Sequence, residues 1–227
     1  MENNSLAQTR CVMFDLDGTL VDSAPDISIS LNEMLADLNL APCNVVQVRN
    51  WMGNGAARLI KRALTGEVDG EPDEPLFKQA QNLFFQSYEK HNGEESQVYA
   101  GVYEGLDVLQ DHGIKMAIVT NKPRRFTPPL MQAFNLEKYF AYVVCGDDLS
   151  VKKPDPQALH NILQKEQLQA AQALMVGDSA SDIHAAQAAK MKSFCVNYGY
   201  HQGKGVEALG ADYIISSIAE IPQYIQQ

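Results

Sequence analysis

The sequence predicts an α/β fold in which helices cover both faces of a parallel sheet, with an all-helical unit inserted into it. From Gly113 onward, short apolar runs alternate with helical segments, a rhythm typical of parallel strands joined by crossover helices. Before that point the rhythm breaks. About a hundred residues separate the first apolar run from the next, whereas a crossover needs only a dozen or somewhat more. We therefore predict a Rossmann-like parallel sheet with helices on both faces and an inserted all-helical cap.

The predicted core elements follow in chain order. Strands are expected at residues 11–14, 114–120, 139–145, 173–176, 193–196 and 213–215, and helices at residues 126–134, 156–167 and 182–190. A further helix near residues 106–110 leads back into the sheet. Right-handed crossovers bring the carboxyl ends of all these strands to one edge, and ligands of open α/β sheets bind at that edge.

The cap is expected to comprise residues 23–97, which separate the two parts of the core, residues 1–22 and 98–227. Amphipathic helical patterns lie at residues 27–38, 56–64 and 75–88, with a polar, acidic loop at residues 66–75. Linkers are expected near residues 23–26 and 98–102. An insertion at this point of the chain would sit as a lid over the ligand-binding edge of the sheet.

Composition limits the partners of this chain. With 227 residues and 45% hydrophobic content, it can bury a proper core as one large domain or a domain carrying a smaller one. The formal net charge of -10 argues against nucleic acid or an anionic membrane surface as partner. An anionic small molecule would also be repelled at long range, so local cations would have to bind it.

The cysteines and the N-terminal segment indicate the compartment. Cys11, Cys43, Cys145 and Cys195 lie far apart without a Cys-x-x-Cys pair, as expected of reduced core thiols. The first ten residues are polar, and no apolar run approaches the length of a membrane span. We expect a soluble, cytoplasmic protein, as a monomer or a homodimer.

The first predicted strand ends in two carboxylates, Asp15 and Asp17, followed by Gly18. Side chains two apart on a strand point the same way, and converging carboxylates repel each other unless a cation or a shared proton offsets the charge. Magnesium is the cation that best suits oxygen-only ligands. The structural alternative is a strand that simply runs into an acidic turn.

Two later segments add complementary groups at the same edge. The second core strand ends in Thr-Asn-Lys at residues 120–122, where the Thr120 hydroxyl and nearby N–H groups can hold phosphoryl oxygens. Prolines stiffen residues 152–156, so a rigidly held lysine there can neutralise both a carboxylate and a phosphate. Lys153, next to the proline, is the stronger candidate than Lys152. The alternatives are a plain strand exit and a solvated basic turn.

The fourth segment, residues 176–182, again ends a buried strand in carboxylates. Asp182 falls in the first turn of the following helix, where an acidic side chain favours the positive helix end without any catalytic role. Asp178 has no such structural explanation. Beside Asp15 and Asp17, it completes an oxygen cage for one magnesium ion.

In order and spacing, these four segments resemble the four motifs of the haloacid dehalogenase superfamily. The resemblance covers the core from residue 11 to residue 227, with the insertion where that superfamily places its cap. It implies that Asp15 is a nucleophile that forms an aspartyl-phosphate. Asp17 would protonate the leaving oxygen and later take a proton from water. Thr120 and Lys153 would hold the phosphoryl group.

The same resemblance implies a magnesium site. Asp15, the backbone carbonyl of Asp17 and Asp178 would bind the ion, and Asp182 would help to orient this shell. The presence of Asp17 favours a phosphatase over a dehalogenase. A halide leaves without a proton, whereas the alkoxide released from a phosphate ester needs one.

A closer resemblance is to the phosphoglycolate phosphatase family. It rests on residues 14–26, 51–56, 119–123, 146–148, 152–156 and 197–200. In this comparison the backbone of Gly53, Asn54 and Gly55 would meet the substrate carboxylate, with Arg58 adding charge. Asn121 is a further candidate substrate-binding residue, together with Thr120 and Lys153. The alternative is an ordinary helix entry with Asn54 as its cap.

Other functions stay open at this point. Related caps serve sugar phosphatases, including one for N-acetylmuramate 6-phosphate, as well as broad-specificity phosphatases, pyrophosphatases and phosphomutases. From a different class, a receiver-like signalling domain also places an acidic pocket, a threonine and a lysine around a phospho-aspartate. Such a domain would have about 120 residues and no lid, which the length of this chain and the pair Asp15 and Asp17 disfavour.

Overall fold

The computed structural model describes residues 6–203 and 205–225. Its main sheet has six parallel strands in the order β5-β4-β1-β6-β7-β8. These are β1 (Cys11–Phe14), β4 (Lys115–Val119), β5 (Tyr142–Val144), β6 (Ala173–Gly177), β7 (Lys192–Val196) and β8 (Tyr213–Ile215). The predicted α/β fold with a parallel sheet is confirmed. The ends of the predicted core, residues 1–5 and 226–227, and residue 204 lie outside the described residues.

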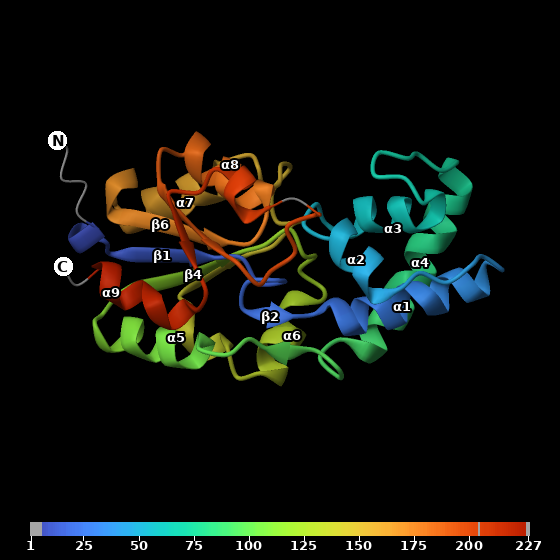
Figure 1. The fold of residues 1–227 in the computed structure, drawn as a ribbon, viewed down its shortest axis with the longest axis horizontal. Coiled ribbons are helices and arrows are strands. Elements are labelled where there is room, and N and C mark those ends of the chain that lie inside the picture. Colours follow the sequence, from blue (N-terminus) through green and yellow to red (C-terminus); the bar gives the residue numbers. More distant parts are fainter. Residues whose placement is uncertain (1–5, 204, 226–227) are drawn as a thin grey trace.

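Helices cover both faces of this sheet (Figure 1). α7 (Gln157–Glu166) and α8 (Ala180–Ala188) lie on one face, and α5 (Val102–Asp111), α6 (Thr127–Ala133) and α9 (Ile221–Ile225) lie on the other. The central strand β1 explains why both faces need cover. Its alternate side chains Val12 and Phe14 pack into one apolar cluster, and Cys11 and Met13 pack into the other.

The strand register brings the polar strand ends together. Phe14, the last residue of β1, pairs with Ile118 of β4 on one side and Val176 of β6 on the other. The residues that follow these three strands therefore emerge side by side at one edge. Asp15 comes directly after β1, and Thr120 directly after β4.

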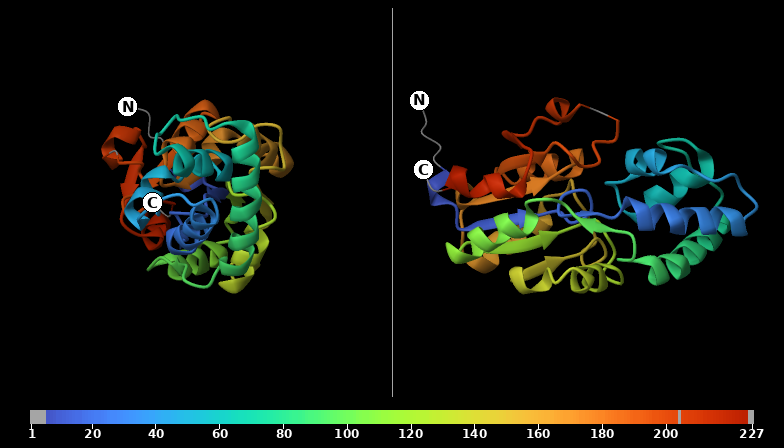
Figure 2. Two further views of the ribbon diagram at one scale, coloured as in Figure 1. Left: turned by 90° about the vertical axis from the view of Figure 1, so that its right-hand side faces the viewer. Right: turned by 60° about the horizontal axis from the view of Figure 1, so that its bottom comes forward.

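A separate helical lobe lies beyond that edge (Figure 2). It contains α1 (Ala24–Asp37), α2 (Val45–Trp51), α3 (Ala56–Thr65) and α4 (Glu74–His91), whose apolar side chains form a cluster of their own. Two short antiparallel strands, β2 (Val21–Asp22) and β3 (Gln97–Val98), join the lobe to the sheet. We call the part of the chain from α1 to α4 the cap.

The connections to the cap differ from the expected linkers in one respect. α1 begins at Ala24 because Pro25 fits the first helical turn, so part of the expected linker is already helical. The carboxylate of Asp26 in this turn is fully buried and accepts hydrogen bonds from the backbone N–H groups of Gly93, Glu95 and Ser96. The start of α1 is thereby tied to the segment that returns from α4.

A shortened strand and an additional helix also distinguish the fold from the sequence expectation. The strand expected at residues 139–145 is shorter, because a 3₁₀ turn at Glu137–Tyr139 precedes β5 and the Tyr139 hydroxyl donates to Asp107. The helix α2, which the sequence did not indicate, has only seven residues. It is held by a capping box in which Asn44 and Gln47 exchange side-chain to backbone hydrogen bonds.

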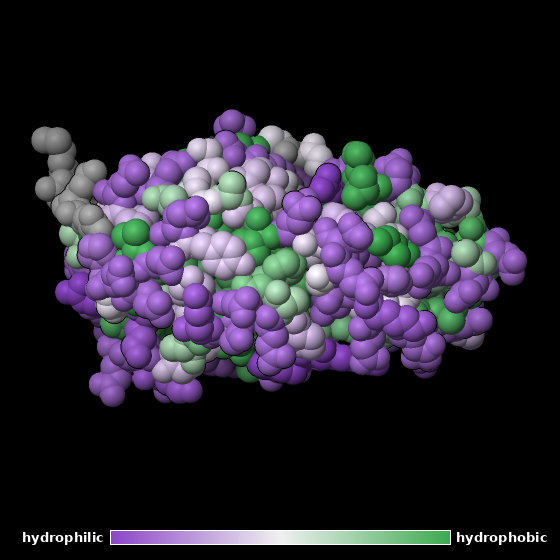
Figure 3. Space-filling view, turned by 90° about the horizontal axis from the view of Figure 1, so that it is seen from below, coloured by the Kyte–Doolittle hydropathy of each residue, from purple (hydrophilic) through white to green (hydrophobic). Residues whose placement is uncertain are grey.

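The face of the molecule in Figure 3 is mostly hydrophilic, with apolar residues in small scattered groups. The larger hydrophobic side chains that the described residues expose are Leu40, Val46, Val68, Tyr103, Val108 and Ile214.

Within residues 6–203 and 205–225, no helix combines the length and the apolar character needed to cross a lipid bilayer.

Candidate active site

Asp15 lies at the centre of the carboxyl edge of the sheet. Its Oδ1 accepts a hydrogen bond from the backbone N–H of Leu16 at 2.7 Å and lies 3.1 Å from Nζ of Lys153. Burial raises the pKa of Asp15 to about 7, and the negative charges of Asp182 and Asp17 act in the same direction. Lys153 opposes this rise. The carboxylate therefore depends on nearby positive charge to stay ionised.

Lys153 is the cation that meets this need. Its Nζ is buried between two carboxylates and donates to Asp182 Oδ1 at 2.5 Å and to the carbonyl of Val119 at 2.6 Å. Burial alone would lower the pKa of Lys153, but the charges of Asp15 and Asp182 raise it. The neighbouring Lys152 is exposed. The structure thus brings Lys153, and not Lys152, to Asp15.

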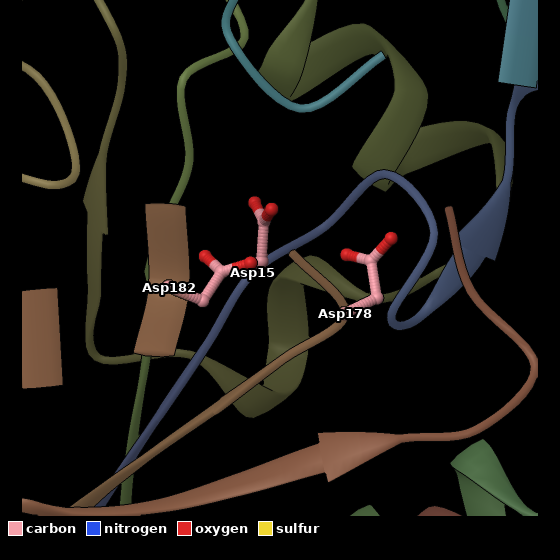
Figure 4. Close-up of side chains that lie close together, drawn as sticks. All are labelled: Asp15, Asp178 and Asp182. Carbon is pink, nitrogen blue, oxygen red and sulfur yellow. The ribbon is translucent and has the colours of Figure 1, made fainter. Parts of the chain in front are cut away.

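Three carboxylates converge beside this lysine (Figure 4). Asp15, Asp178 and Asp182 are buried, and each offers an oxygen within 4.8 Å of the others. Burial raises the pKa of Asp178 well above its usual range, with repulsion from Asp182 and Asp15 adding to the effect. One lysine cannot offset three carboxylates, so the arrangement favours a further cation.

Magnesium fits this set of donors. All three groups are hard oxygen donors, which this ion prefers, and each is already held in place by the fold. Asp178 accepts hydrogen bonds from the Thr19 hydroxyl at 3.0 Å and the Tyr200 N–H at 2.6 Å. Asp182 accepts from the backbone N–H and the hydroxyl of Ser179 at the start of α8.

The side chain of Asp17 has other partners than the three grouped carboxylates. Its Oδ1 accepts a hydrogen bond from the Ser23 hydroxyl at 2.6 Å and lies 3.1 Å from Nζ of Lys122. Lys122 also donates to the Tyr88 hydroxyl at 2.5 Å, and Tyr88 belongs to helix α4 of the cap. Burial by itself would lower the pKa of Lys122, but Asp17 and Tyr88 raise it. The ammonium group is therefore charged.

Sequence reasoning missed Lys122. It stands in the Thr-Asn-Lys segment that was singled out for Thr120, but nothing in the local pattern distinguishes a buried lysine from a solvated one. Its side chain is 3% exposed, because Tyr88 covers it from a helix more than thirty residues earlier in the chain. Only the folded arrangement of cap and core reveals the contact.

Thr120 and Asn121 occupy the same edge with different surroundings. Thr120 is buried, and its hydroxyl accepts a hydrogen bond from the backbone N–H of Lys122 at 3.2 Å. The Asn121 amide donates to the carbonyls of Gly53 at 3.2 Å and Lys153 at 3.0 Å. Asn121 thus links the cap to the core and holds the backbone of Lys153 in place.

A pocket lies over these groups and is lined by residues of both the core and the cap. Its floor contains Asp15, Asp17 and Thr120, and its cap side is largely apolar. The lining residues are Asp15, Asp17, Ile27, Met52, Gly53, Gly55, Ala56, Leu59, Phe84, Tyr88, Thr120, Asn121, Lys122, Pro123 and Phe126. A polar ligand group at the floor would therefore face hydrophobic side chains on its other side.

The glycine-rich cap loop lies partly in this pocket. Gly53 and Gly55 line it with positive φ angles of 104° and 83°, a conformation that side chains other than glycine rarely adopt. Asn54 turns aside, donating to the Ser181 hydroxyl at 3.3 Å and accepting from Gln202 at 2.9 Å.

The structure does not bring Arg58 to the pocket in which the sequence analysis expected it. Its guanidinium donates to the carbonyl of Gly70 at 3.3 Å and to Glu71 at 2.9 Å. Both partners belong to the acidic loop between α3 and α4, and Arg58 is not among the residues that line the pocket.

Comparison with known proteins agrees with this geometry. Residues 12–196 match the family described as haloacid dehalogenase-like hydrolase. The chain belongs to this family. The resemblance inferred from the four motifs is therefore confirmed. The match covers both the cap and the strand ends that carry Asp15, Thr120 and Asp178.

This haloacid dehalogenase-like hydrolase also has full-length relatives. It is 44% identical over 218 residues to a phosphoglycolate phosphatase from Nitrosospira multiformis, with 96% of each chain covered. It is 39% identical over 222 residues to one from Nitrosococcus oceani, covering 98% of this chain and 99% of the relative. The crystal structure of a predicted phosphoglycolate phosphatase from Haemophilus somnus 129pt is similar with a TM-score of 0.91 at 34% identity, covering 97% and 99%.

Proposed function

We propose that this hydrolase is a magnesium-dependent phosphatase that cleaves a small phosphate monoester, with 2-phosphoglycolate as its preferred substrate. The observation that carries the proposal is the meeting of Asp15, Asp17 and Lys153 at one buried edge beneath a cap. The full-length relatives named phosphoglycolate phosphatase support the choice of substrate. A receiver-like signalling domain is disfavoured, because the chain is a hydrolase by family and carries a cap.

In the first proposed step, an Asp15 oxygen attacks phosphorus and the bond from phosphorus to the ester oxygen breaks. Asp17 gives a proton to that leaving oxygen, so the alcohol product departs neutral at that position. Lys153 and the Thr120 hydroxyl bind phosphoryl oxygens during the transfer. The phosphoryl group then remains on Asp15 as a mixed anhydride.

In the second step, water attacks this phosphorus while Asp17, now ionised, takes the proton of the water. The bond from phosphorus to Asp15 breaks, and inorganic phosphate leaves. Magnesium, held by Asp15, Asp178 and the Asp17 carbonyl with support from Asp182, would supply positive charge against the phosphoryl oxygens. The cap would exclude bulk water from the intermediate.

The deciding experiment measures inorganic phosphate release from 2-phosphoglycolate, glucose 6-phosphate, N-acetylmuramate 6-phosphate and AMP, with magnesium and with a chelator. We expect kcat/KM for 2-phosphoglycolate to exceed the others by about tenfold or more, and activity to vanish with the chelator. Asp15→Asn protein purified in parallel excludes a contaminating phosphatase. Preference for a hexose phosphate would replace the substrate but keep the mechanism, whereas no release from any ester would refute both.

We also propose that the protein acts in the cytoplasm. All four cysteines are buried and free, which is typical of proteins kept in a reducing compartment.

A further inference from the structure

Beside Lys153, the site contains a second buried lysine, Lys122, to which the proposed phosphoryl-transfer steps give no task. Nζ of Lys122 lies 3.1 and 3.3 Å from the two carboxylate oxygens of Asp17. It also lies 4.6 Å from the centroid of the Tyr88 ring. Burying an ammonium group costs free energy that its partners must offset. A lysine kept in such a place, on the wall of the substrate pocket, calls for a role beyond packing.

Lys122 is also the one cation among the described residues that line this pocket. Lys153 lies below, between Asp15 and Asp182, and Arg58 is paired with Glu71 elsewhere. The cap side of the pocket is lined by apolar side chains and glycine backbone, with the Tyr88 hydroxyl as its polar side-chain group. A carboxylate that entered without a cationic partner would therefore lose its hydration with nothing to replace it.

Distance links this lysine to one class of substrate. As the acid in ester cleavage, Asp17 must lie within hydrogen-bonding reach of the ester oxygen, at about 3 Å. In 2-phosphoglycolate a single methylene, with bonds of about 1.5 Å, separates that oxygen from the carboxyl carbon. A carboxylate so close to the ester oxygen must lie near Asp17, and Nζ of Lys122 is 3.1 Å from Asp17.

We propose that Lys122 is a specificity-determining residue that binds the carboxylate of the substrate. Tyr88 positions the ammonium group from the cap side. The inference rests on the proposed function and narrows it to phosphate monoesters that carry a carboxylate on the same carbon as the ester oxygen. A carboxylate attached further along the chain would instead reach the apolar wall near Leu59 and Phe84.

The test compares two substrates of nearly equal size, 2-phosphoglycolate and 2-hydroxyethyl phosphate, which lacks the carboxylate. Because Lys122 also contacts Asp17, Lys122→Met should lower kcat on both substrates. Binding of the carboxylate predicts an additional rise of KM on 2-phosphoglycolate alone. The ratio of the two kcat/KM values should then fall by about tenfold or more. Lys122→Arg, which keeps the charge, should restore most of that ratio.

Controls separate the two proposals. Lys78→Met removes an exposed positive charge of α4 that is outside the pocket lining and should leave the ratio unchanged. If Lys122→Met does not fold, Lys122→Gln goes through the same comparison. An equal loss on both substrates would overturn the inference and leave Lys122 as a positioning residue for Asp17. A wild-type enzyme that does not prefer 2-phosphoglycolate over 2-hydroxyethyl phosphate would instead overturn the proposed substrate.

Discussion

The core and the cap contribute to the pocket in different ways. On the core side, Asp15, Asp178 and Asp182 are each held by at least two hydrogen bonds or ion pairs from the fold. On the cap side, the lining consists of apolar side chains and glycine backbone, with the Tyr88 hydroxyl as its polar side-chain group. Fixed charges suit bond breaking, because they need no rearrangement as charge moves.

This difference suggests a division of labour. The rigid sheet edge carries the groups that act on the phosphoryl group. This is the part that all phosphate ester substrates have in common. The cap presents the surface that meets the leaving group, which differs between substrates. Lys122 belongs to the core by sequence, yet Tyr88 of the cap holds it, so it stands at the junction of the two.

The strongest test of the core side replaces the proposed nucleophile. Asp15→Asn should reduce phosphate release by about a thousandfold or more, because an amide oxygen cannot form the phosphoryl intermediate. The fold should persist, since burial already favours the uncharged form of this side chain. Phosphate release and thermal unfolding of both proteins check this. Activity above about one per cent of wild type would contradict the assignment.

The next largest effect is expected from replacing Lys153, and it should be absent when the adjacent Lys152 is replaced. Lys153→Met should lower kcat by about a hundredfold or more and destabilise the protein by about 3 kcal/mol, because it leaves the pair Asp15 and Asp182 without their shared cation. Lys152→Met should change neither quantity appreciably. Steady-state kinetics and urea unfolding measure both variants. Equal effects at the two positions would mean that buried placement does not decide the role of Lys153.

The core site could be predicted from the sequence because its signal is local. A buried apolar run that ends in a carboxylate is unusual, and parallel strand register then requires such ends to meet. Asp15 and Asp178 therefore followed from short segments, and β1 and β8 have the predicted bounds.

The contacts between the cap and the core were harder to predict, because they join segments that are distant in the sequence. Arg58 lies one helical turn beyond the glycine loop, but its direction depends on Glu71 in a loop with no regular pattern. Lys122 is buried only because α4 packs over it. Charge and spacing alone do not decide whether a long basic side chain faces a pocket or a neighbouring acid.

A smaller effect is expected in the way the thermal stability of the protein depends on pH. Without metal, the folded chain holds the Asp15 proton up to about pH 7, whereas the unfolded chain releases it near the ordinary value of 3.8. Raising the pH through this window therefore favours the unfolded chain, and stability should fall. Magnesium should oppose the loss above pH 7, raising Tm by about 5 °C at saturating concentration. Thermal unfolding at pH 5 and pH 8, with magnesium or a chelator, measures this.

The control for that measurement is Asp178→Asn, which removes one proposed ligand and should reduce the gain in Tm from magnesium. An equal gain at both pH values, or an undiminished gain in the variant, would argue against a site built from these carboxylates.

The smallest effect is expected at Arg58, and it tests whether the cap wall stays apolar when substrate binds. Arg58→Gln should leave KM for 2-phosphoglycolate within about twofold of wild type, because the guanidinium lies with Gly70 and Glu71 outside the pocket lining. Stability should change by about 0.5 kcal/mol or less, since the ion pair is at the surface and Lys61 also holds Glu71. A tenfold rise of KM would show that α3 turns Arg58 toward the substrate, and carboxylate binding would then belong to the cap as well as to Lys122.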